Sequence, residues 1–154
     1  MKLILPILEL ALLLFAGAKP PAIPQGVVVS CHDGDTLRLS VAGDVRTIRL
    51  AGIDAPELRQ AGGLESRNAL AEMAVGQRVQ WLEVDRDRYG RSVAYVWLHG
   101  QSLGQRQLRT GWAWAYDEHA APGYQRMEDY AHAARLGLWA ARATAIEPWV
   151  WRRR

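Results

Sequence analysis

Residues 26–50, with the sequence GVVVSCHDGDTLRLSVAGDVRTIRL, decide the fold. Their apolar residues form a short run or alternate with polar ones, and two turns interrupt them, Asp-Gly at 33–34 and Ala-Gly-Asp at 42–44. Alternation with a period of two indicates strands, and short turns of this composition let consecutive strands pair antiparallel. The segment therefore predicts three strands in meander order over about residues 26–51.

The rest of the chain supplies the other elements of the expected fold. These are a helix, two strands and two further helices, over residues 64–75, 77–84, 92–98, 102–110 and 123–138. Five short antiparallel strands with a helix after the third are typical of a small closed barrel of the OB kind. The sequence thus predicts a mainly β, α+β domain: a five-stranded OB-fold β-barrel with about three helices.

The N-terminal stretch has the composition of an export signal. Lys2 gives a positive start, residues 3–15 are largely aliphatic, and residues 16–18 are small, as signal peptidase requires. We expect cleavage near Ala18 and export to the periplasm or the medium, which leaves 19–25 as a leader, 26–151 as the domain and 152–154 as a basic tail. The alternative is an uncleaved membrane anchor, although residues 3–15 are fewer than the roughly 20 that a spanning helix needs.

Length, charge and cysteine content limit the class of protein. A chain of 154 residues, 49% hydrophobic and 23% charged, suits one folded domain rather than a disordered chain. The net charge of +3 is compatible with a polyanionic partner but does not require one. Because Cys31 is the only cysteine, no intrachain disulfide can form, and stability has to come from the core.

Three polar motifs at the ends of predicted strands carry reactive side chains. They are DGDT at 33–36, RLAGIDAPE at 49–57 and DRYGR at 87–91. Cleavage of a phosphodiester needs a hard cation held by carboxylates, cationic groups that grip the phosphate, and a free carboxylate that activates water. The motifs offer all of these groups, although each one alone is also typical of a charged turn.

In this order, the three motifs resemble the staphylococcal nuclease family, and the resemblance extends over about residues 26–151. It implies a role for nine residues. These are the calcium ligands Asp35, Asp54 and the backbone carbonyl of Ala55; the catalytic residues Arg49, Glu57 and Arg91; and the substrate-binding residues Arg88, Tyr89 and Tyr116. In the family, the two arginines clamp the phosphate and the glutamate orders or deprotonates the attacking water.

The resemblance also implies a function: a secreted, calcium-dependent nuclease that hydrolyses phosphodiester bonds of DNA and RNA and leaves 3′-phosphorylated products. It implies no stable protein partner, and we expect a monomer. One alternative is a non-catalytic OB-fold module that binds nucleic acid, and another is a hydrolase of a different phosphoester. The complete set of acids and arginines favours an enzyme, because a module that only binds has no need of it.

Some residues depart from the family's pattern or invite a second interpretation. We expect His32 to be a packed or half-exposed ring rather than a metal ligand, because calcium prefers oxygen. Gln105 and Gln107 stand where relatives often have an acid and an apolar residue, which leaves the packing of the short helix open. The tryptophans are expected to fill the core or pin the last helix and tail to the barrel. The arginines at 152–154 are expected to form a frayed, solvated terminus, with non-specific contact to nucleic acid as the alternative.

Overall fold

The structure, a computed structural model, describes residues 22–116, 119–141 and 145–154. The expected export signal lies outside these ranges. Within them, no helix has both the length and the apolar character that crossing a membrane requires.

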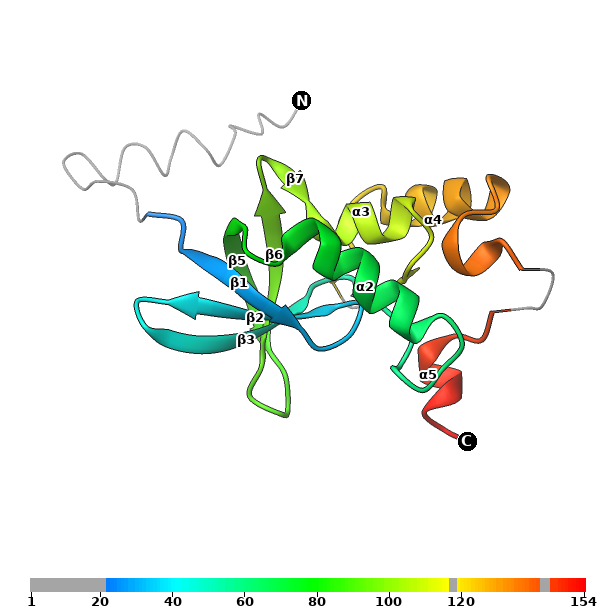
Figure 1. The fold of residues 1–154 in the computed structure, drawn as a ribbon. Coiled ribbons are helices and arrows are strands. Elements are labelled where there is room, and N and C mark those ends of the chain that lie inside the picture. The colour runs from blue at the N-terminus through cyan, green and yellow to red at the C-terminus, as the bar shows by residue number, and fades with distance from the viewer. Residues whose placement is uncertain (1–21, 117–118, 142–144) are drawn as a thin grey trace, which may run out of the picture.

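Five strands form a closed barrel (Figure 1). They are β1 (Gln25–Cys31), β2 (Thr36–Val41), β3 (Asp44–Leu50), β5 (Arg78–Arg86) and β6 (Ser92–Leu98). Neighbours pair antiparallel in the order β3-β2-β1-β5-β6, and a pairing between β3 and β6 closes the ring. That closing pair is parallel, as one pair must be in a ring with an odd number of strands. The predicted five-stranded OB-type barrel is confirmed.

Three two-residue strands extend this framework. β7 (Gln101–Ser102) pairs with the end of β6, while β4 (Ile53–Asp54) pairs antiparallel with β8 (Trp114–Ala115) in a second, small sheet. The strand pattern of the sequence did not predict them, because two residues show no periodicity. The β4–β8 pair fixes the loop that carries Asp54, one of the predicted site residues.

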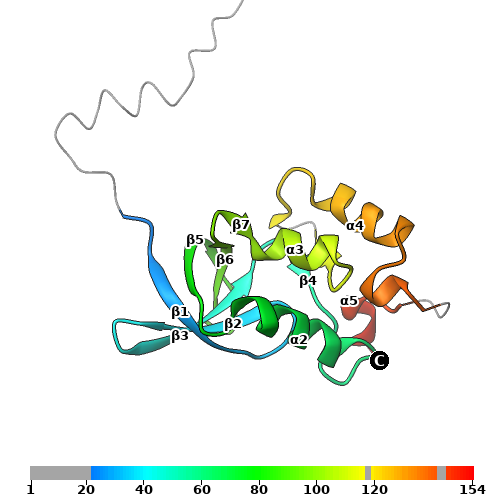
Figure 2. The ribbon, with the colours of Figure 1, turned by 45° about the horizontal axis from the view of Figure 1, so that its top comes forward.

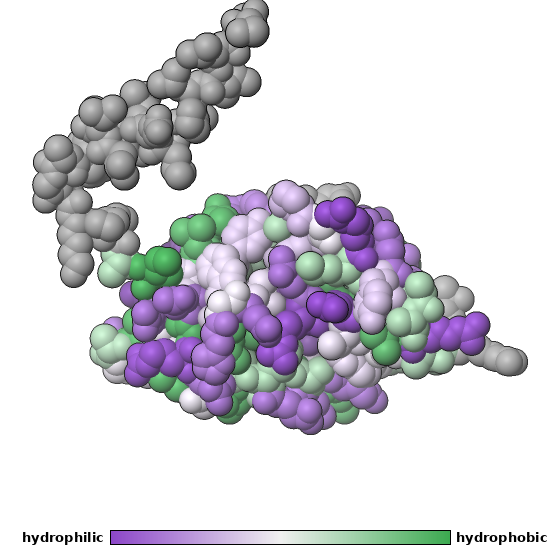
Figure 3. Space-filling view, turned by 90° about the horizontal axis from the view of Figure 1, so that it is seen from above, coloured by the Kyte–Doolittle hydropathy of each residue, from purple (hydrophilic) through white to green (hydrophobic). Residues whose placement is uncertain are grey.

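The helices gather on one side of the barrel (Figure 2). They are α2 (Gly63–Ala74), α3 (Leu103–Arg109), α4 (Tyr124–Ala133), the 3-10 turn η2 (Gly137–Trp139) and α5 (Pro148–Trp151). The first two agree with the predicted helices to within two residues. Polar side chains cover much of the face that Figure 3 shows, with apolar ones interspersed among them.

The predicted last helix over 123–138 is wrong in its second half. α4 ends at Ala133, because Arg135 and Gly137 both adopt a positive φ of 53°. At Gly137 a side chain would collide with the backbone of Gly111, and the amide of Leu138 donates to the Gly111 carbonyl at 2.9 Å. The chain therefore turns here to pack closely against the segment that follows α3.

The core lies inside the barrel and under the helices. Its members are fully buried aliphatic side chains of the strands and of α2 and α3, among them Leu37, Leu39, Ile48, Leu50, Val79, Leu70, Leu103 and Leu108. Burying a side chain of this kind stabilises the fold by about 1.5–3 kcal/mol relative to leaving it exposed. Trp114 is buried as expected, and Trp149 lies against it with ring centroids 6.5 Å apart.

Candidate active site

The turn between β1 and β2 presents a buried carboxylate. The side chain of Asp35 is bound on both oxygens: Oδ1 accepts the Thr36 hydroxyl at 2.9 Å, and Oδ2 accepts the Ala55 amide at 2.8 Å. The Leu50 amide also donates to the Asp35 carbonyl at 2.7 Å. These bonds join the turn to the segment after β3, so two motifs that lie far apart in the sequence become one structure.

Strand register places Arg49 beside this turn. Thr36 on β2 is opposite Arg49 on β3, which brings Nη2 of Arg49 to 3.7 Å from Oδ2 of Asp35 and to 3.2 Å from Oδ1 of Asp54. Burial alone would lower the pKa of Arg49, but the charges of Asp35 and Asp54 outweigh it, and the pKa is raised. Arg49 is therefore a fixed cation shared between two acids.

The loop after β3 carries Asp54 and Glu57 into the same place. Gly52 has φ +75°, and a side chain there would meet the carbonyl of His119 at 2.4 Å, so only glycine fits. The side chain of Asp54 is 2% exposed and that of Glu57 is 40% exposed. The buried acid suits metal binding and the exposed one suits a reaction with water.

The tip of the β5–β6 hairpin brings the remaining arginines. Asp87 accepts both the backbone amide of Arg91 at 2.9 Å and its Nε at 2.6 Å, which aims the Arg91 guanidinium. Arg88 donates to the hydroxyl of Tyr89 at 2.7 Å, and the Tyr89 ring is exposed. The tip thus presents two guanidinium groups and an aromatic face to the acids.

One hollow of about 420 Å³ collects eight of the nine predicted site residues, Asp35, Arg49, Asp54, Ala55, Glu57, Arg88, Tyr89 and Arg91. The ninth, Tyr116, lines an adjoining hollow of about 490 Å³ that shares Arg49, Asp54 and Arg91 with the first. The structure therefore brings all nine together, while their individual roles stay predictions. His32 is exposed rather than packed, and it lines the same hollow.

Comparison with known proteins agrees with this arrangement. Residues 47–141 match the family described as Staphylococcal nuclease homologue. The chain belongs to this family. It is 41% identical to a micrococcal nuclease of Shigella flexneri over 141 residues, 84% of this chain and 80% of that protein. It is also 40% identical to Protein ParB of Escherichia coli, over 84% of this chain and 79% of that protein, and 38% identical to an uncharacterized endonuclease of Haemophilus influenzae, over 82% and 71%.

The acids of this staphylococcal nuclease homologue are suited to hold a divalent cation. Burial, and then the charge of Asp35, raise the pKa of Asp33 to about 7, and burial raises the pKa of Asp54 despite its bonds to arginines. Carboxylates crowded in this way are stabilised by a cation. Among the described residues no three His, Cys, Asp or Glu side chains form a metal cluster. The carboxylates of Asp35 and Asp54 and the carbonyl of Ala55 would fill part of a calcium shell and leave the rest to water and phosphate oxygens.

One site residue of the staphylococcal nuclease homologue escaped the sequence analysis. Arg152, expected in a frayed terminus, instead follows α5 and reaches the acids, so that expectation is wrong. Its Nη2 lies 2.6 Å from Oδ2 of Asp54, and its Nη1 lies 3.2 Å from Oδ1 of Asp54 and 2.8 Å from Oε1 of Glu57. The hydrogen bond to Asp54 contributes most to raising the pKa of Arg152. A proline at 148 is a helix-start signal that could have revealed α5.

Gln107, which departs from the pattern of the family, has a structural role. Its side chain is fully buried, and Nε2 donates to the carbonyls of Gly34 at 2.8 Å and Ser66 at 3.1 Å. These bonds tie α3 to α2 and to the turn that carries Asp35. Gln107 therefore supports the site from behind, and an apolar residue could not make these bonds.

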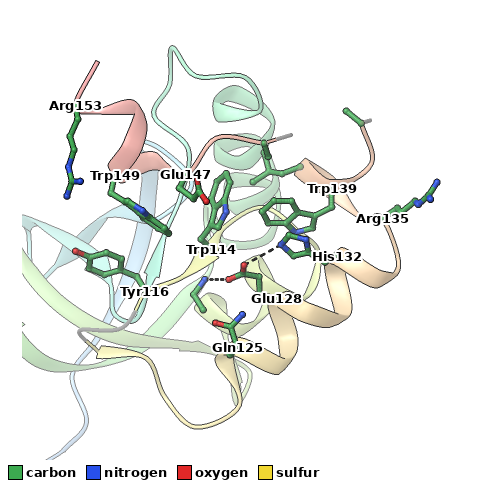
Figure 4. A pocket seen from close by; sticks show the side chains of 14 residues that line it. Trp114, Tyr116, Gln125, Glu128, His132, Arg135, Trp139, Glu147, Trp149 and Arg153 are labelled. Atoms are coloured by element: carbon green, nitrogen blue, oxygen red, sulfur yellow. Dashed lines mark hydrogen bonds and ion pairs between the residues drawn. The ribbon is translucent and has the colours of Figure 1, made fainter. Parts of the chain in front are cut away.

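A larger hollow of the staphylococcal nuclease homologue, about 830 Å³, is also lined by Tyr116 and lies between β8, α4 and α5 (Figure 4). Its aromatic walls include Trp114, Trp139 and Trp149. Its buried acid, Glu128, accepts the Ala115 amide at 2.6 Å and so holds β8 in place. Size therefore does not identify the active site: the acids and arginines that cleavage requires converge in the smaller hollow.

Proposed function

We propose that this protein is an exported, calcium-dependent nuclease that hydrolyses phosphodiester bonds of DNA and RNA. The observation that carries the proposal is the meeting of Asp35, Arg49, Asp54, Glu57 and Arg91 in one hollow. Membership of the staphylococcal nuclease homologue family, and relatives named as nucleases, support it. Calcium, when bound, would supply a positive charge that stabilises the negative charge building up on the phosphate.

In this proposal, Asp35, Asp54 and the carbonyl of Ala55 hold the cation. They come from two loops that the Asp35–Ala55 hydrogen bond joins, so the ligands have a fixed spacing before the metal binds. Preformed ligands lower the conformational cost of binding the metal.

The two arginines grip the non-bridging oxygens of the scissile phosphate. A guanidinium presents its N–H donors in a planar fork that matches two phosphate oxygens, which a lysine cannot reproduce. Arg49 is held by two acids and Arg91 by Asp87, so both forks are oriented in advance. Donors oriented in advance stabilise the charge of the transition state without reorganising.

Glu57 orders or deprotonates the attacking water, and its partial exposure gives water access to it. The leaving group is the 5′ oxygen, close to Arg91, and the products carry a 3′ phosphate. Tyr116 offers a face on which a base stacks, at about 1–3 kcal/mol for each base. Arg88 and Tyr89 at the hairpin tip match positions that, in the family, lie near a terminal phosphate of the bound nucleotide.

The test is the release of acid-soluble nucleotides from denatured DNA and from RNA, with calcium, with magnesium and with chelator. We expect turnover with calcium only, and a fall in kcat of about 10²–10⁴ in Glu57→Gln, which keeps the size of the side chain and removes the base. Sensitivity of the product ends to a phosphatase specific for 3′ phosphates reports the cleaved bond. No turnover together with full nucleic-acid binding in chelator would instead establish the non-catalytic module.

Export is tested separately. Cell fractionation and N-terminal sequencing of the mature protein should find it outside the cytoplasm and starting near Lys19. Recovery of the intact chain in the membrane fraction would establish the uncleaved anchor.

A further inference from the structure

Arg152 occupies the oxygens that the proposed calcium site would use. It approaches both carboxylate oxygens of Asp54, at 2.6 and 3.2 Å, and bridges to Glu57 at 2.8 Å. The side chain of Asp54 is 2% exposed, so few other approaches to these oxygens remain. A guanidinium fork on both oxygens and a cation bound to one of them repel each other and need the same space. The two are therefore alternatives at Asp54.

The segment that contains α5 holds Arg152 close to the acids. Pro148 is buried, and Trp149 packs against Trp114 and, with ring centroids 5.7 Å apart, against Tyr116 (Figure 4). Ahead of α5, the side chain of Gln60 donates to the carbonyl of Ile146. These contacts hold α5 on the body of the protein with Arg152 over the acids.

The guanidinium of Arg152 can move while the helix stays in place. Its side chain is 43% exposed, against 18% for Arg49, so Arg152 lies at the mouth of the hollow and Arg49 lies inside it. Arg49, Arg88 and Arg91 line the same hollow. Once Asp54 no longer binds it, Arg152 keeps Glu57 as a partner at 2.8 Å and gains an entering phosphate as a second anion within the same hollow.

We propose that Arg152 is a third phosphate-binding arginine of this site, and that it competes with calcium for Asp54. Without metal it neutralises Asp54 and Glu57. Once Asp54 binds calcium, Arg152 is displaced and binds the phosphodiester of the substrate. The proposal rests on the proposed nuclease function for its second half only, because competition for Asp54 needs no turnover.

Calcium titration by isothermal calorimetry, without substrate, tests the competition. Arg152→Gln should tighten calcium binding about fivefold or more, because the competitor that lowers the competent fraction is gone. Arg153→Gln, which removes the same charge from the next residue, should stay within about twofold of the wild type, since Arg153 is exposed to screening by salt and lines the hollow beyond Tyr116 rather than the one that holds Asp54. Trp149→Ala keeps the charge of Arg152 but loosens α5, and should tighten calcium binding in the same direction as Arg152→Gln.

Steady-state hydrolysis of denatured DNA at saturating calcium tests the contact with phosphate. Arg152→Gln should lower kcat about tenfold or more, as loss of one oriented donor does, while Arg153→Gln keeps the wild-type value. Unfolding in chelator, followed by circular dichroism, checks that the variants are folded. If Trp149→Ala does not fold, the two arginine variants still decide.

Equal calcium affinity in Arg152→Gln and Arg153→Gln would overturn the competition. Tighter calcium binding with unchanged kcat would overturn the contact with phosphate. An altered calcium affinity in a protein that never turns over would leave the competition standing and reject the nuclease function instead.

Discussion

The proposed active site has two halves with unequal support, one built into the barrel and one attached to it. The barrel half holds Asp35, Arg49 and Asp54, whose side chains are 6%, 18% and 2% exposed and bind one another. The attached half holds Arg91 on a hairpin tip and Arg152 after a four-residue helix, with side chains 29% and 43% exposed. Arginine side chains of the same chemistry are thus held by a buried barrel strand in one half and by more exposed segments in the other.

This difference teaches which substitutions affect folding as well as catalysis. Residues of the barrel half satisfy buried charges, so their removal leaves a charge without a partner in a place that water reaches poorly. In the attached half, Arg91 pairs with Asp87, which is 17% exposed, so water can replace part of that partner. Arg152 reaches the partly exposed Glu57 as well as the buried Asp54. Stability and activity should therefore change together in the first half and separately in the second.

The pair Arg49→Gln and Arg91→Gln gives the largest expected effects. Each should lower kcat by about 10²–10³, because each removes one oriented donor to the phosphate. Arg49→Gln should also lower the free energy of unfolding by roughly 3 kcal/mol, since it leaves the buried Asp35 without its arginine and Asp54 with Arg152 alone. Arg91→Gln should lower it by no more than about 1 kcal/mol. Urea unfolding beside kinetics measures both, and equal losses of stability would contradict the division into two halves.

Gly52→Ala tests how closely the barrel half is packed. Alanine there combines a φ of +75° with a methyl group 2.4 Å from a backbone carbonyl, so we expect a loss of about 2–3 kcal/mol in unfolding free energy. Gly43→Ala is the matched control: its φ is +92°, but nothing lies within 4 Å of the added methyl group. It should cost about 1 kcal/mol. Equal costs would show that the loop around Asp54 yields to the clash.

The barrel half could be predicted from the sequence because it follows local patterns. Alternation with a period of two gives β2 and β3, their turn sets the register, and the register puts Arg49 opposite Thr36 beside Asp35. The motifs stand at strand ends, where a barrel brings them together. Physical expectation and family resemblance therefore pointed to the same residues.

What the sequence did not predict depends on contacts between distant segments. α4 ends early because Gly137 packs against Gly111, which no local pattern reveals. Arg152 reaches Asp54 across 98 positions of the sequence, and contacts between distant segments, such as the packing of Trp149 on Trp114, put it there. A run of terminal arginines is ordinarily solvated, so composition pointed the wrong way.

Gln107→Met tests the hydrogen bonds that support the barrel half from α3. The change preserves shape but leaves the carbonyls of Gly34 and Ser66 without the Nε2 donor, at a cost of about 2 kcal/mol in unfolding free energy. Gln105→Met on the same helix is the control, because Gln105 is only half-buried and no side-chain hydrogen bond is found for it among the described residues. The control should stay within about 0.5 kcal/mol of the wild type. Urea unfolding measures the loss in both variants. Equal losses of unfolding free energy would show that the buried hydrogen bonds of Gln107 do not stabilise the fold.

The smallest expected effect is that of Asp87→Asn, in the attached half. Burial works against ionisation of Asp87, but the hydrogen bonds from Arg91 outweigh it, and the pKa of Asp87 is lowered. A lowered folded-state pKa means that the ionised pair contributes stability above the unfolded pKa of about 4, and that this contribution is lost as the pH falls through the folded value. The free energy of unfolding of the wild type should therefore exceed that of Asp87→Asn by at most about 1 kcal/mol between pH 5 and pH 8, and this difference should shrink below about pH 4. Denaturant unfolding across this range measures the difference, and one that grew on acidification would mean that the aspartate is not held ionised by Arg91.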